Sequence, residues 1–119
     1  MYIIGAVFYA VWGVLHLGAA KRGFDLAKSQ EPGPVQGRLY QNAWNLAFAA
    51  VFVILIAVIY NLKNSPMGYW LNLSLASITD IGFIIFVLIP GYISLREGIL
   101  GPVLWILAVI FSTLGILAA

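Results

Sequence analysis

Four long apolar segments alternate with shorter polar ones along this chain. The apolar segments cover roughly residues 2–20, 39–62, 69–89 and 102–118. At ~1.5 Å of rise per residue, a helix of this length can cross a hydrocarbon core of ~30 Å, the last one only just. The pattern therefore predicts an all-α fold, an integral membrane four-helix bundle that occupies residues 1–119 as a single domain.

The connections between the apolar segments differ in character. Residues 21–38, KRGFDLAKSQEPGPVQGR, form the only substantial polar stretch and are predicted to be a loop, although residues 21–28 could also continue the first helix beyond the membrane. The Pro32-Gly33-Pro34 sequence within this stretch breaks helices. Residues 61–68 predict a short turn, and residues 90–101 a mixed segment along the membrane interface.

Composition supports a membrane protein. Charged residues make up 8% of the chain and hydrophobic residues 63%, whereas soluble domains carry about 25% charged residues. A net charge of +2 is too small to indicate nucleic-acid binding, which needs a clustered basic face. The absence of cysteine excludes thiolate nucleophiles and zinc–thiolate sites.

The basic residues predict an orientation. Five of the six fall on the side of the first and third connections, namely Lys21, Arg22, Lys28, Arg38 and Arg96. Only Lys63 falls on the other side. Because cytoplasmic loops are enriched in Lys and Arg, we expect a multi-pass inner-membrane protein with both termini outside.

Two of the segments show one inward face each when drawn at 100° per residue. The first span has a stripe of Gly5, Tyr9, Trp12 and His16, opposite a stripe of aliphatic residues. The third span has a broad face around Asp80, again opposite aliphatic residues. Since membrane helices present aliphatic side chains to lipid, both polar faces should point into the bundle.

The second span has two special stripes. One consists of Gln41, Asn45, Phe48 and Phe52, and the other, roughly opposite, of Ala43, Ala47, Ala50 and Ala57. We expect the polar stripe to face the bundle interior. The alanine stripe would then permit close approach of another helix. That helix belongs either to the same chain or to a second copy, which would make the protein a homodimer.

His16 and Asp80 are the candidate catalytic acid–base pair, because one can carry a proton while the other orients it. A carboxylate at mid-depth in a membrane is costly and usually faces a protein interior. The residues expected to line the same pocket and bind a ligand are Trp12, Gln41, Asn42, Trp44, Asn45, Asn72 and Ser77. An equally direct interpretation is a structural polar cluster that fixes helix register. No cofactor is predicted, and the pair alone supplies too few ligands for a closed metal site.

The first span ends in WGVLHLG and the second opens with QGRLYQNAWN. In these patches and in its layout the chain resembles small four-span bacterial membrane proteins, including DoxX-like proteins, a resemblance that implies the architecture but no activity. The chain also has the size of small multidrug exporters, which act as dimers and rely on a Glu in the first span. Here that span holds only His16 as an ionisable side chain.

Three functions follow as hypotheses. The first is a non-catalytic accessory or apolar-ligand-binding membrane module, whose partner would be a membrane lipid or an apolar small molecule. The second is a membrane-embedded enzyme acting on a lipid, isoprenoid or quinone through His16 and Asp80. The third is a proton-coupled transporter that works as a homodimer, although polar residues are sparse in the half of the bundle nearer the termini.

Overall fold

The computed structural model describes all 119 residues, and its regular structure is entirely helical. The helices are α1 (Tyr2–Lys28), α2 (Pro34–Ile59), η1 (Asn61–Lys63), α3 (Pro66–Phe83), η2 (Ile84–Leu88), α4 (Leu95–Gly98) and α5 (Leu100–Ala118). Here η1 is a 3₁₀ turn and η2 is a π-helical continuation of α3. Four helical segments are long and apolar enough to cross a membrane, which confirms the predicted all-α, four-helix membrane architecture.

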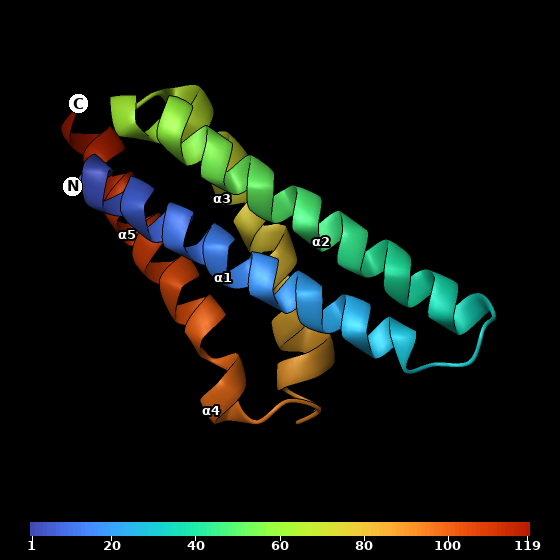
Figure 1. Cartoon of the computed structure of the whole chain (residues 1–119). Coiled ribbons are helices and arrows are strands. Elements are labelled where there is room, and N and C mark those ends of the chain that lie inside the picture. Colours follow the sequence, from blue (N-terminus) through green and yellow to red (C-terminus); the bar gives the residue numbers. More distant parts are fainter.

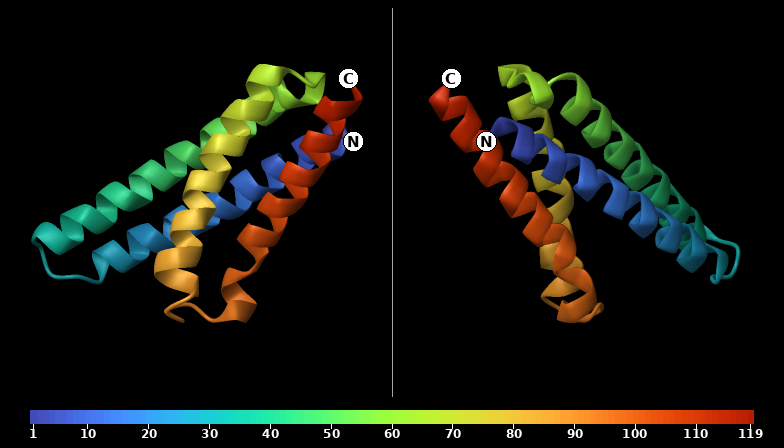
Figure 2. Two further views of the ribbon diagram at one scale, coloured as in Figure 1. Left: turned by 180° about the vertical axis from the view of Figure 1, so that it is seen from behind. Right: turned by 60° about the vertical axis from the view of Figure 1, so that its left-hand side comes forward.

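The four long helices form two hairpins, α1 with α2 and α3 with α5 (Figure 1). Both chain termini and the α2–α3 turn lie at one end, which we call the terminal end. The hairpins meet there and diverge toward the opposite end, where the α1–α2 connection and α4 lie far apart (Figure 2). We call this opposite end the divergent end.

The predicted polar loop is largely helical, because α1 runs on to Lys28 and α2 already begins at Pro34. Proline is well suited to the first turn of a helix, so Pro34 opens α2 rather than breaking it. The short connection is closed by the amide of Gln36, which donates to the carbonyl oxygens of Ala27 and Gln30, each at 3.0 Å. Helices α1 and α2 therefore extend well past the predicted spans at the divergent end.

The alanine stripe of α2 packs against α1 of the same chain. Ala43 and Ala50 are fully buried, and Ala57 is 1% exposed. The backbones come close because α1 places a glycine here, so a Cβ added to Gly13 would lie 2.9 Å from the carbonyl oxygen of Ala50. Ala43, Ala50 and Ala57 are thus covered within the chain, whereas Ala47 is half-buried, and the homodimer through this stripe stays a prediction.

The prediction that the polar stripe of α2 faces the bundle interior is wrong. Gln41 and Asn45 are exposed, and so are Phe48 and Phe52 farther along the helix. The reason is that the alanine stripe on the opposite side of α2 packs against α1, so the polar stripe points away from it. At the divergent end of a long hairpin, water and lipid headgroups can solvate polar side chains, so no buried partner is required.

Helix α1 is the centre of the fold. It contacts α2 and α5 extensively, whereas its backbone stays farther from α3. The buried apolar cluster consists of Tyr9, Trp12, Val53, Ala57, Ala76, Leu104 and Ala108. On the opposite side of α1, Val7, Val11 and Val14 are exposed, so the predicted inward and outward faces of this helix are confirmed.

We expect Gly13→Ala to destabilise the fold, because the added methyl group would force α1 and α2 apart at Ala50. Gly18→Ala is the matched control, since no atom lies within 4 Å of a Cβ at Gly18. On propensity alone, either change should favour the helix by up to ~1 kcal/mol. Thermal melting in detergent should therefore fall for Gly13→Ala and stay equal or rise for Gly18→Ala. Equal melting of the two variants would show that the helices do not pack closely here.

Candidate functional site

Asp80 lies at the centre of the bundle and is fully buried. Helix α3 directs its carboxylate toward α1, where the indole Nε1 of Trp12 donates a hydrogen bond of 2.8 Å to Asp80 Oδ2. Trp12 is also fully buried. A side-chain bridge thus joins two helices whose backbones do not approach closely, and it gives the buried carboxylate one firm partner.

His16 is the second partner of Asp80. Its Nε2 lies 3.3 Å from Asp80 Oδ1, a looser contact than the 2.7–2.9 Å typical of charge-assisted hydrogen bonds. The imidazole ring stacks on the indole of Trp12 with centroids 3.8 Å apart, one helical turn away. The three side chains therefore form one compact group, which we call the Trp12–His16–Asp80 centre.

The tautomer of His16 follows from its other contact. Its Nδ1 lies 2.8 Å from the backbone carbonyl oxygen of Trp12. A carbonyl oxygen can only accept a hydrogen bond, so Nδ1 carries a hydrogen. Nε2 is then the ring nitrogen that faces Asp80 Oδ1, at 3.3 Å. An imidazole nitrogen and a carboxylate oxygen can each bind a proton, so the pair has the chemistry needed for proton transfer.

Helix α5 closes the centre from the third side through a glycine that sequence reasoning missed. A Cβ added to Gly101 would lie 3.2 Å from His16 Cε1 and 3.8 Å from Asp80 Oδ1. Only a residue without a side chain fits against the imidazole without displacing it. The sequence signal was the Gly101-Pro102 pair at the start of the last span.

Four predicted ligand-binding residues on α2 lie outside the centre. Gln41, Asn42, Trp44 and Asn45 are all exposed, and Gln41 accepts a hydrogen bond from Arg38 at 3.1 Å. Trp44 packs on Phe48 rather than on His16. The structure therefore brings His16, Asp80 and Trp12 together, as predicted, and separates them from these α2 residues.

Asn72 and Ser77 lie on the inward face of α3 but in different surroundings. Asn72 is fully buried, and its amide nitrogen donates to Asn61 Oδ1 at 2.8 Å and to the carbonyl oxygen of Val53 at 3.1 Å. Ser77 accepts a hydrogen bond from Trp105 Nε1 at 2.9 Å, which ties α3 to α5. Asn72 thus fastens α3 to the preceding hairpin at the terminal end.

No grouping of three or more histidine and carboxylate side chains occurs in the structure. His16 and Asp80 would offer at most two ligands, fewer than the three or four protein ligands of typical zinc sites. What the centre can do chemically is hold and transfer a proton.

Fold and centre together define the chain as a multi-pass helical membrane protein with a buried His–Asp pair. Comparison with protein-family models, with curated proteins and with solved structures finds no match. The resemblance to DoxX-like proteins therefore stays a prediction.

We expect Asp80→Asn to fold nearly as well as the wild type. The amide oxygen can accept from Trp12 Nε1, and the amide nitrogen can donate to Nε2 of neutral His16. Asp80→Leu should instead melt at lower temperature, because it leaves the buried indole N–H of Trp12 without a partner, at a cost of ~1–3 kcal/mol. Thermal melting in detergent distinguishes the two. Equal losses for both variants would mean that the negative charge, rather than hydrogen bonding, holds the centre together.

Proposed function

We propose that this protein is a non-catalytic accessory module of the membrane, in which the Trp12–His16–Asp80 centre holds the four helices in one arrangement. The observation that supports this most directly is the closure of the centre. Asp80 is fully buried, its Oδ2 accepts a hydrogen bond from Trp12, and its Oδ1 lies 3.3 Å from His16 Nε2. A side chain engaged in this way orders the bundle without needing a substrate.

The enzyme alternative has less support from the geometry. A catalytic acid or base must reach the proton it transfers on a substrate, at hydrogen-bond distance or through one water. At the Trp12–His16–Asp80 centre those positions are filled by the indole of Trp12, the imidazole of His16 and the backbone of Gly101. A lipid, isoprenoid or quinone would have to displace one of them before it could react.

We also propose that the protein lies in an inner membrane with its terminal end outside. The basic residues support this placement, because Lys63 is the only one in the turn at the terminal end, while the other five precede, follow or lie within the connections at the divergent end. Cytoplasmic connections carry this excess of Lys and Arg. The divergent end would then face the cytoplasm.

Single cysteines test this orientation directly, since the chain has none of its own. Ser29 lies in the connection at the divergent end and Ser65 in the turn at the terminal end. In intact cells, a membrane-impermeant maleimide should label Ser65→Cys and spare Ser29→Cys until the cells are opened. Labelling of Ser29→Cys alone in intact cells would reverse the orientation.

The non-catalytic role predicts that no lipid-derived molecule depends on the centre. Native mass spectrometry of the purified protein should find the same bound lipids in the wild type and in His16→Gln. Ser74→Ala is the control, because Ser74 is exposed and bonds only to its own helix. If one molecule binds at one-to-one stoichiometry and is lost in His16→Gln but kept in Ser74→Ala, the ligand-binding or enzyme alternative is correct.

A further inference from the structure

Four buried side-chain atoms have no hydrogen-bond partner within the chain. They are the Tyr9 hydroxyl, Asn72 Oδ1, Asp80 Oδ1 and Ser112 Oγ. Ser112 is 4% exposed and the other three residues are fully buried. An unpaired polar group in the interior of a membrane protein costs several kcal/mol, and ordered water is the usual partner of such groups. Four in so small a bundle call for a common explanation.

The unpaired atoms of α1 and α5, the Tyr9 hydroxyl and Ser112 Oγ, lie one after the other along the long axis of the bundle. A Cβ on Gly5 would meet Ser112, and a Cβ on Gly101 would meet His16, so α1 and α5 run antiparallel in a fixed register. Tyr9 follows Gly5 by about one helical turn, or ~6 Å, in the direction of His16. The order from the terminal end is therefore Ser112, then Tyr9, then His16.

Helix α3 contributes the other two unpaired atoms, Asn72 Oδ1 and Asp80 Oδ1, along the same part of the bundle. Asn72 lies near the terminal end, where it bonds to Asn61 of the α2–α3 turn. Asp80 follows two turns later, ~12 Å along the helix axis. Tyr9 belongs to the same buried apolar cluster as Ala76, the α3 residue midway between them. Polar atoms thus recur about once per turn from the terminal end to the centre.

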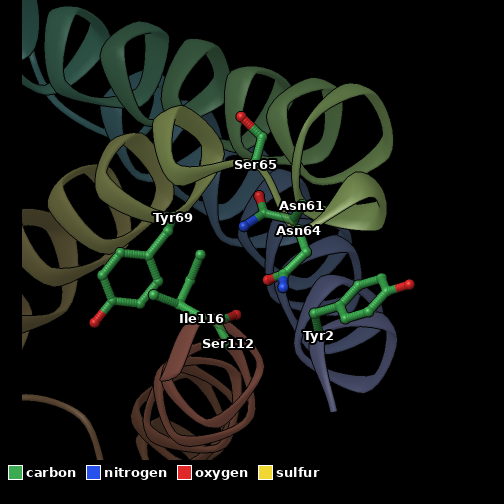
Figure 3. Close-up of a pocket in the computed structure, with 7 residues that line it drawn as sticks. All are labelled: Tyr2, Asn61, Asn64, Ser65, Tyr69, Ser112 and Ile116. Atoms are coloured by element: carbon green, nitrogen blue, oxygen red, sulfur yellow. The ribbon is translucent and has the colours of Figure 1, made fainter. Parts of the chain in front are cut away.

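The first members of this series adjoin a polar surface pocket. The pocket is lined by Tyr2, Asn61, Asn64, Ser65, Tyr69, Ser112 and Ile116, from the start of α1, the α2–α3 turn and the end of α5 (Figure 3). Ser112 belongs both to the pocket and to the set of unpaired atoms, and Asn61 bonds to Asn72. The buried polar atoms therefore connect to the surface at the terminal end.

At the other end of the series, His16 keeps a small exposed fraction, 8%, whereas Asp80 has none. No other strongly acidic or basic group faces it. Helix α5 has no ionisable side chain, and those of α2, Arg38 and Tyr40, lie in its first two turns at the divergent end. His16 and Asp80 are thus the proton carriers, while the phenol groups of Tyr9 and Tyr69 lie on the side of the terminal end.

We propose that this polar seam, made of Ser112, Asn72, Tyr9, Asp80 and His16, is a path for protons through the bundle. A proton enters at the pocket and moves through bridging water and the Tyr9 hydroxyl, which can both donate and accept. It binds Asp80 Oδ1 and passes to His16 Nε2. The imidazolium formed in this way releases one proton to water on the side of the divergent end, which restores the neutral ring. Asn72 Oδ1, which only accepts, orients a bridging water.

The pocket is too narrow to hold a water molecule without movement of its walls. Its rim includes Tyr2 and Ile116, which belong to the ends of α1 and α5, where helices fray most readily. Water then enters only when the rim opens. The path therefore operates as a gated relay and not as an open pore, and proton flow should be slow compared with that of a channel.

The test uses the full chain reconstituted in liposomes, with a pH-sensitive dye inside and a potassium diffusion potential to drive protons. Wild-type liposomes should change internal pH faster than protein-free liposomes. Asp80→Asn should lose this flux, because an amide cannot carry the proton. Tyr9→Phe and Ser112→Ala should also lose most of it while melting like the wild type, since each removes only an atom without a partner in the chain.

The matched controls are Ser74→Ala and Tyr92→Phe, which change the same groups at exposed positions. Both should conduct like the wild type. The path is wrong if wild-type liposomes behave like protein-free ones, or if Asp80→Asn conducts normally. Normal flux in both Tyr9→Phe and Ser112→Ala would equally overturn the route. Because flux is measured separately from melting and bound lipid, this result does not decide the accessory role.

Discussion

The carboxylate of Asp80, fully buried in the middle of a membrane-spanning helix, is the constraint on which the arrangement depends. An aspartate at that depth costs about 2.5–3.5 kcal/mol even on insertion scales, and more if it has no partner. The fold meets this cost with an indole and an imidazole from one helix, one turn apart. Helix α1 is therefore fixed in rotation and depth relative to α3, although the two backbones stay apart.

The separation of α1 and α3 has a consequence for what fills the space between them. Close packing of α1 uses small residues, with glycine against alanine toward α2 and glycine against Ser112 toward α5. Toward α3, by contrast, the contacts come from Tyr9, Trp12 and His16. Long side chains with polar ends are the ones that can span a wider gap. The same geometry leaves some of those ends without partners in the chain.

The inward faces of α1 and α3 could be predicted because each helix has one polar face and one aliphatic face, and lipid accepts only the second. For α2 the same reasoning failed, since its alanine stripe packs against α1 and its polar residues Gln41 and Asn45 lie toward the divergent end of a long hairpin. Wheel angles say nothing about depth once a helix is longer than the membrane is thick. The role of Gly101 was invisible for another reason, because a glycine carries no chemistry of its own and matters only through the ring packed against it.

The order of the residues along the chain bears on how the protein enters the membrane. Helices α1 and α2 precede α3 in the chain and form a closely packed hairpin, so we expect Trp12 and His16 to be in place when α3 emerges. Asp80 then reaches the bilayer with donors waiting on its neighbour, which lowers the barrier to insertion of an otherwise unfavourable span. Helix α5 arrives last and covers the centre with Gly101. Folding from the N-terminus would therefore bring the carboxylate of Asp80 into the membrane next to its partners on α1.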